Sequence, residues 1–71
     1  MKLTTDQRAA LMGHYVTHHN IAVRRHCHAI ILFDDGFSVR RVAALTSSPA
    51  EDVHDCIRRF RAGGMDALLG G

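Results

Sequence analysis

The chain has 71 residues, of which 46% are hydrophobic, and it carries nine lysines and arginines against seven aspartates and glutamates. A chain of this length forms one domain, here residues 1–71, and buries only roughly 60% of the surface that its unfolded form exposes. Its formal charge of +2 falls well short of that of a protein that binds nucleic acid by electrostatics alone. Few aromatic residues are present, which favours helices over a β-sandwich or barrel. They are Tyr15, Phe33, Phe37 and Phe60.

The sequence predicts neither a membrane span nor a secretory segment. The longest apolar run, Ala29 to Phe33, is far shorter than the roughly 20 residues that span a bilayer. The N-terminus runs directly into polar residues typical of a helix start. We therefore expect a cytoplasmic protein in which Cys27 and Cys56 are reduced thiols.

The first helix is predicted over residues 5–18. Thr4 precedes Gln7 by three residues, which is the spacing of a capping box, in which each side chain accepts a hydrogen bond from the other's backbone. Polar residues at 17–20 end the helical pattern. The apolar residues that recur at helical spacing between these points are Leu11, Met12, Tyr15 and Val16.

The second helix is predicted over residues 21–33 and ends at Asp34-Asp35-Gly36, where Gly36 is the expected left-handed stop. Two aspartates at a helix C-terminus oppose the helix dipole. We therefore expect one of them to serve the following turn instead. The predicted inward face consists of Val23, Cys27, Ile30 and Ile31.

Two further helices are predicted, over residues 39–45 and 49–61. Ser38 is the expected cap of the first, with Val42 and Ala43 inward and with Arg40 and Arg41 outward. The start of the second combines a Ser48 cap, Pro49 at the first helical position and Glu51 at the third. Its inward stripe is expected to hold Val53, Cys56, Ile57 and Phe60. The helix is expected to end at Gly63-Gly64, and residues 65–69 to form an apolar turn that folds back on the core.

Two short helices joined by a tight turn are typical of a helix-turn-helix unit, here at about residues 38–61. In such a unit the first helix crosses the DNA backbone and the second enters the major groove. The predicted fold is therefore all-α, a small helix-turn-helix bundle of four helices plus a short C-terminal helical turn. Periodicity alone leaves DNA binding and a plain helical bundle equally open.

A resemblance to a known family favours DNA binding. Residues 24–45 read RRHCHAIILFDDGFSVRRVAAL. They resemble the homeodomain-like helix-turn-helix at the N-terminus of mariner-type bacterial insertion-sequence transposases and related orphan domains, and residues 53–69 continue the likeness. In that family the region binds DNA, and a separate acidic catalytic domain cuts it. The resemblance implies a stand-alone binding module, a truncated remnant or an excised domain.

The chain departs from the family at the turn. The family has Leu-Gly-Val-Ser followed by basic or hydroxyl residues, whereas this chain has residues 46–49, Thr-Ser-Ser-Pro, followed by Ala50-Glu51-Asp52. An aromatic residue, often Trp, is common in the family where this chain has Cys56. The formal charge over residues 49–61 is zero, and the acidic residues lie at the end that is expected to reach the bases.

Candidate DNA-binding residues come from the last three helices and their caps. They are Arg25, Ser38, Arg40, Ser48, Ala50, Glu51, His54, Asp55 and Arg58. We expect Arg40 and Arg58 to contact phosphates, while ordinary solvated helix surface is the competing interpretation. Glu51 either closes a capping box with Ser48 or accepts a hydrogen bond from cytosine N4.

The alternative function is a protein-interaction or dimerisation module that uses the acidic start of helix 49–61 against a basic partner. Double-stranded DNA is the expected partner under the first interpretation, and a homodimer is possible under either. The first helix, with Leu11, Tyr15 and the histidines, is the expected dimer contact.

Neither a metal site nor an enzyme is predicted. His14 and His18 are one turn apart and His26-Cys27-His28 follows, but this spacing fits no standard zinc finger. Cys27 and Cys56 fall on predicted core stripes, where a thiol behaves as a small hydrophobic group. We therefore expect no metal, no cofactor, no catalytic residue, no small-molecule substrate and no membrane partner.

Overall fold

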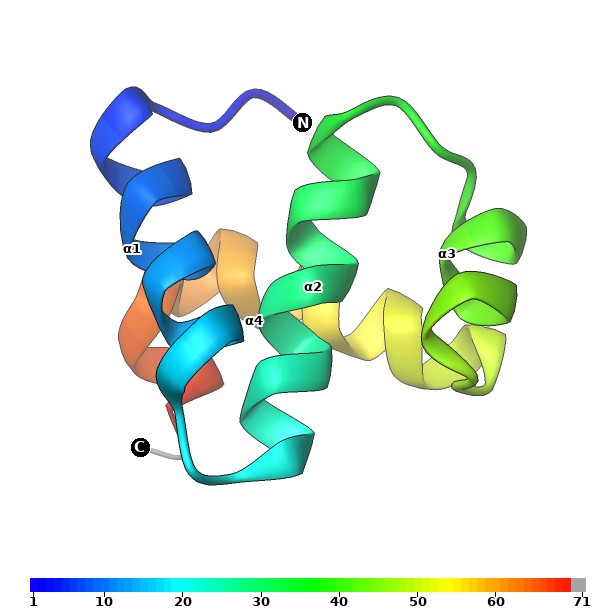
Figure 1. Ribbon diagram of the computed structural model, residues 1–71. Coiled ribbons are helices and arrows are strands. Elements are labelled where there is room, and N and C mark those ends of the chain that lie inside the picture. The colour runs from blue at the N-terminus through cyan, green and yellow to red at the C-terminus, as the bar shows by residue number, and fades with distance from the viewer. Residues whose placement is uncertain (70–71) are drawn as a thin grey trace.

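The computed structural model describes residues 1–69 and contains four helices, α1 (Thr5–Thr17), α2 (Ile21–Asp34), α3 (Val39–Thr46) and α4 (Ala50–Leu68). α1 and α3 lie on either side of α2, and α4 crosses behind it (Figure 1). No strand occurs within residues 1–69, so the all-α prediction is confirmed, and each helix begins within one residue of its expected start. In this part of the chain no helix is long and apolar enough to cross a membrane.

Local capping explains where the first three helices begin. The Thr4–Gln7 capping box is present in full, with both hydrogen bonds formed. The side-chain oxygen of Asn20 accepts from the backbone N–H groups of Ala22 and Val23, and the Ser38 hydroxyl accepts from the backbone N–H of Arg41 at 3.2 Å. Each of these bonds satisfies backbone donors that a helix start leaves without a partner.

The hydrophobic core surrounds α2, against which the other three helices pack. The predicted inward face of α2, which carries Cys27 and Ile30, is buried as expected. Ala29 is buried as well, because a central helix is covered on more than one side. The buried hydrophobic residues from the other helices are Leu11, Val42, Val53, Cys56, Ile57, Phe60 and Leu68.

The apolar residues of α1 lie mostly outside the core. Of the four that recur at helical spacing, only Leu11 is buried, whereas Met12, Tyr15 and Val16 are exposed. The physical reason is that α1 packs chiefly against the single helix α2, which covers only a narrow stripe of it. Leu11 is therefore part of the core, and its proposed role in a dimer contact is wrong.

An ionic clasp joins the start of α1 to the end of α2. Nη1 of Arg8 lies 2.9 Å from Oδ2 of Asp34, and Nη2 lies 2.8 Å from Oδ1 of Asp35. Oδ1 of Asp34 also accepts from the backbone N–H of Leu3 at 2.9 Å. The expectation that one aspartate serves the following turn is wrong, because the arginine holds both. Its positive charge offsets the unfavourable position of two carboxylates at a helix C-terminus.

The start of α4 differs from the predicted capping box. Pro49 is the N-cap residue rather than the first helical residue, and α4 has no side-chain cap. The Ser48 hydroxyl instead donates to the carbonyl of Thr46 at 3.3 Å. Ser47, with φ 54°, turns the chain so that Ser48 bonds back to α3 and is not available to Glu51. The capping role of Ser48 and Glu51 is therefore wrong.

The far end of α4 confirms the predicted C-terminal turn. The helix bends sharply at Gly64, whose φ of 65° and ψ of −150° are not helical. After the bend, Leu68 is buried and Met65 packs on the core. Glycine suits this position because a positive φ is strained for residues with a Cβ atom. The turn closes the end of the core, as the sequence predicts.

We expect Asp34→Ala to lower the free energy of unfolding by about 1–2 kcal/mol, since it removes one charged hydrogen bond and leaves the backbone N–H of Leu3 unpaired. Urea unfolding followed by circular dichroism measures this difference. Asp66→Ala is the matched control, because Asp66 is exposed and forms no ion pair within residues 1–69. Equal midpoints for the two variants would mean that the clasp contributes nothing.

We expect Ser47→Gly to stabilise the protein by about 0.5–1 kcal/mol, because it removes the left-handed strain at the cost of a more flexible unfolded chain. Ser47→Val should destabilise it by about 1 kcal/mol, since a β-branched side chain is strained at positive φ. Thermal unfolding measures both changes. Ser48→Gly serves as the control, and a gain at position 48 as large as that at 47 would contradict the explanation.

Candidate nucleic-acid interface

The turn between α3 and α4 has the hydrogen bonds of a Schellman motif. The backbone N–H of Ser48 donates to the carbonyl of Ala43 at 2.9 Å, and that of Ser47 to Ala44 at 3.3 Å. Ser47 holds the left-handed position that glycine usually occupies in this motif. Residues 47–49 thus join two packed helices with little freedom, as a helix-turn-helix requires.

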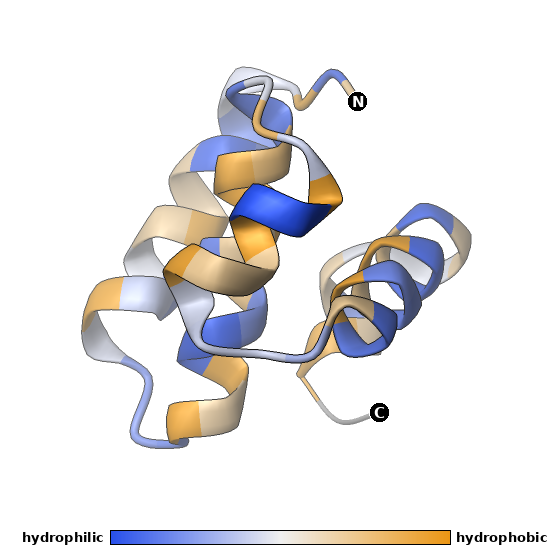
Figure 2. Cartoon of the chain, turned by 90° about the vertical axis from the view of Figure 1, so that its right-hand side faces the viewer, coloured by the Kyte–Doolittle hydropathy of each residue, from blue (hydrophilic) through white to orange (hydrophobic). Residues whose placement is uncertain are grey.

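The two sides of α4 differ sharply. Val53, Cys56, Ile57 and Phe60 form the buried stripe, as predicted. The opposite stripe is exposed and consists of Ala50, Glu51, His54, Arg58 and Arg61. Four candidate residues from the sequence, at positions 50, 51, 54 and 58, therefore share one open face. Strongly hydrophilic segments also mark α3, which faces the viewer in Figure 2, and α4 beside it.

Asp55 lies at the edge of this face, and its charge is neutralised within α4. One carboxylate oxygen pairs with the guanidinium of Arg58, and the other lies 3.0 Å from Nε of Arg59. The structure thus pairs two candidate DNA-binding residues, Asp55 and Arg58, with each other. The charges around the middle of the exposed face are therefore paired, and Arg58 already has a partner.

Four arginines on α2 and α3 form no ion pair within the described residues 1–69: Arg24, Arg25, Arg40 and Arg41. Arg40 and Arg41 are exposed on the first turn of α3. Arg41 was not among the residues that the sequence singled out for DNA, although its pairing with Arg40 was a usable signal. Arg25 is exposed and lines a narrow crevice of about 80 Å³ with Pro49 and Asp52 at the start of α4.

His26, in the same crevice, responds to this charge distribution. Partial burial lowers the pKa of His26, and the positive charges of Arg59 and then Arg25 lower it further. Asp52 and Asp55 act in the opposite direction but more weakly. At the His26 ring, the two arginines therefore outweigh the two carboxylates in their effect on the pKa.

The two candidate serines have structural partners. The Ser38 hydroxyl caps α3, and the Ser48 hydroxyl bonds to Thr46. Ser38 lies at the start of α3 and Ser48 in the turn after it, so α3 separates them. A phosphate contact by either hydroxyl would compete with these bonds. The structure brings the candidates on α4 together and leaves Ser38 and Arg40 as a second group.

Among residues 1–69, no group of three or more histidine, cysteine, aspartate or glutamate side chains is placed to hold a metal ion. Cys27 and Cys56 are buried and free, and burial raises the pKa of both thiols, that of Cys56 to about 12. Thiols with raised pKa values are weak nucleophiles. The rings of His14 and His18 lie 5.7 Å apart on α1.

Comparisons with protein-family models, with curated proteins and with solved structures found no match to this chain. The likeness to transposase helix-turn-helix domains therefore remains a prediction from the sequence. The fold and the geometry described above are the basis for a functional proposal.

We expect the stability of the protein to fall as the pH rises from about 9 towards 12. Cys56 has a raised pKa in the folded state, so the unfolded chain loses its thiol proton first and deprotonation favours unfolding. The contribution is complete below the ordinary thiol pKa and is lost above it. Urea midpoints at about pH 8 and about pH 10.5 measure the effect. In Cys56→Ala the decrease should be smaller, and an unchanged decrease would exclude the thiol as its source.

Proposed function

We propose that this chain binds double-stranded DNA through α3 and α4, with the exposed face of α4 in the major groove. It would act as a small transcriptional regulator or a transposition-related module. The observation that carries this proposal is the open face of α4, in a unit whose other helix, α3, exposes Arg40 and Arg41 with no ion pair within residues 1–69. A helix that is packed on one side only suits groove insertion, and free cations on the neighbouring helix suit phosphate contacts.

The arginines divide into two groups by their availability. Arg40 and Arg41 are free to contact phosphate, and Arg25 extends the positive surface beside the start of α4. Arg58 and Arg59 are held by Asp55, so a duplex phosphate must compete with that carboxylate. Both pairs are exposed, and such surface pairs contribute only up to about 1 kcal/mol each, which a phosphate contact can offset.

The acidic first turn of α4 limits the affinity expected of this interface. The negative charges of Glu51 and Asp52 are stabilised at the positive end of the α4 dipole. This end of the helix has no side-chain cap. In the groove these carboxylates face the phosphate charge, so nonspecific binding should be weak. Glu51 is suited to accept a hydrogen bond from cytosine N4. The repulsion between Glu51 and phosphate would then weaken binding to random sequence, while the hydrogen bond stabilises binding to a site with cytosine at that position.

One observation favours the alternative of a protein-interaction or dimerisation module. Glu51 and Asp52 are exposed and have no cationic partner within the described residues. Two free carboxylates at the start of an exposed helix suit a basic protein surface. Under this alternative the chain keeps the helix-turn-helix frame but does not bind duplex DNA.

Fluorescence anisotropy with a labelled random-sequence duplex at two salt concentrations tests the proposal. We expect salt-sensitive binding that the double variant Arg40→Ala, Arg58→Ala weakens at least about tenfold, with the salt slope reduced by about 0.9 for each lost phosphate contact. Lys2→Ala removes one exposed charge outside the unit and is the matched control.

Asp55→Asn sharpens the same test, because it should release Arg58 and Arg59 and tighten duplex binding by several fold. Absence of binding to the duplex even at low salt, for both this variant and the original chain, would overturn the DNA proposal. That outcome would favour the alternative, in which the acidic first turn of α4 binds a basic protein.

A further inference from the structure

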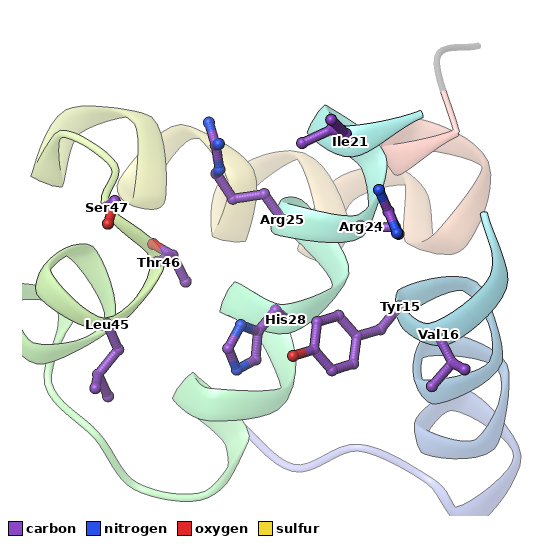
Figure 3. A pocket seen from close by; sticks show the side chains of 9 residues that line it. All are labelled: Tyr15, Val16, Ile21, Arg24, Arg25, His28, Leu45, Thr46 and Ser47. Carbon is purple, nitrogen blue, oxygen red and sulfur yellow. The ribbon is translucent and has the colours of Figure 1, made fainter. Parts of the chain in front are cut away.

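A second surface, formed without any residue of α4, contains an open groove of about 550 Å³. It lies between α1 and the C-terminal end of α3, over the first half of α2 (Figure 3). The residues that matter for its chemistry are Tyr15, Val16, Ile21, Arg24, Arg25 and Leu45. The groove exists because α1 and α3 both pack on α2 and stand apart from each other (Figure 1).

Three exposed aliphatic side chains lie on the rim of the groove, among polar lining residues. Val16 is 65% exposed, Ile21 62% and Leu45 49%. Single exposed aliphatic side chains are common, but these three come from three helices and line one depression. The groove therefore offers an apolar contact from each of three helices.

The groove has an ordered floor. The rings of Tyr15 and His28 are stacked, with centroids 4.5 Å apart and planes inclined by 23°. Figure 3 shows these rings pointing toward each other from α1 and α2. Stacking bridges the two helices and holds the floor in place before any partner arrives, which lowers the entropy cost of binding.

The charged residues of the groove indicate the kind of partner that it binds. Arg24 and Arg25 both line it and pair with no carboxylate within residues 1–69, and no acidic residue belongs to the lining. Two free guanidinium groups beside three exposed aliphatic side chains complement a partner that carries both apolar and acidic side chains. A two-fold dimer through this groove would instead bring like charges together.

We propose that this groove docks an acidic amphipathic helix from another protein. The apolar side of that helix covers Val16, Ile21 and Leu45, and its carboxylates pair with Arg24 and Arg25. This is helix-in-groove recognition, in which anchors at i, i+3, i+4 and i+7 enter the depression. Because α4 does not line the groove, this docking leaves the exposed face of α4 free, although Arg25 lines both the groove and the crevice at the start of α4.

The test uses the full chain and a fluorescein-labelled synthetic helix of about 18 residues with leucines at the anchor positions and glutamates beside them. A matched peptide carries lysine in place of every glutamate. We expect the acidic peptide to bind with a Kd of about 10–100 μM and the basic peptide at least about tenfold more weakly. Amide chemical-shift changes in NMR spectra should cluster at Val16, Ile21 and Leu45.

Variants assign the binding to the groove. The double variant Val16→Asp, Leu45→Asp should reduce the affinity at least about tenfold, and Arg24→Gln by several fold. Both apolar positions are exposed, so circular dichroism should show an unchanged fold. Met12→Asp, at a position of α1 that is 41% exposed and outside the groove, should leave the affinity unchanged.

Three outcomes would overturn the proposal. Equal affinity for the acidic and basic peptides would remove the role of the arginines. Displacement of the bound peptide by duplex DNA would make the groove part of a nucleic-acid surface. A dimer in sedimentation velocity that Leu45→Asp dissociates and that excludes the peptide would assign the groove to a second copy of the chain.

Discussion

The burial of α2 is the constraint on which the rest of the structure depends. Cys27 and Ile30 are fully inaccessible to solvent, and the other three helices each reach the core through contact with this one element. Because α1 and α3 occupy its two flanks and α4 crosses behind, only one part of its surface remains open (Figure 1). The open face of α4 and the groove between α1 and α3 are both consequences of this arrangement.

The helices around α2 are held in different ways. α1 has one buried side chain, Leu11, and it packs along α2 and is joined to it by the clasp of Arg8 with Asp34 and Asp35. α4 contributes a full stripe of buried residues and is closed at its end by Leu68. The wall of the groove that α1 forms therefore depends on contact with α2 and on two ion pairs, whereas the candidate DNA surface on α4 depends on a buried apolar stripe.

Local signals in the sequence were sufficient for the positions of the helix starts, the left-handed Gly36 and the buried stripes of α2 and α4, because these features depend on neighbouring residues. They gave the wrong cap for α4, since the Ser48 hydroxyl bonds to Thr46 instead. Local signals were insufficient where a contact joins residues that are far apart in the sequence. The clasp joins Arg8 to carboxylates 26 and 27 positions away, and no local rule connects them. Four candidates on one face of α4 followed from helical spacing, whereas the pairing of Asp55 with Arg58 and the groove required side-chain positions in space.

The buried stripe and the exposed stripe of α4 are under selection for different properties, the first for folding and the second for binding. Substitutions at Val53 or Ile57 change packing and hence folding. The side chains of Glu51 and His54 are exposed to solvent, so substitutions there have little effect on folding. They change directly the contacts made with any molecule bound to this face. The exposed stripe can therefore diversify rapidly among copies of such a domain without loss of the fold, and new binding preferences can arise on an unchanged framework.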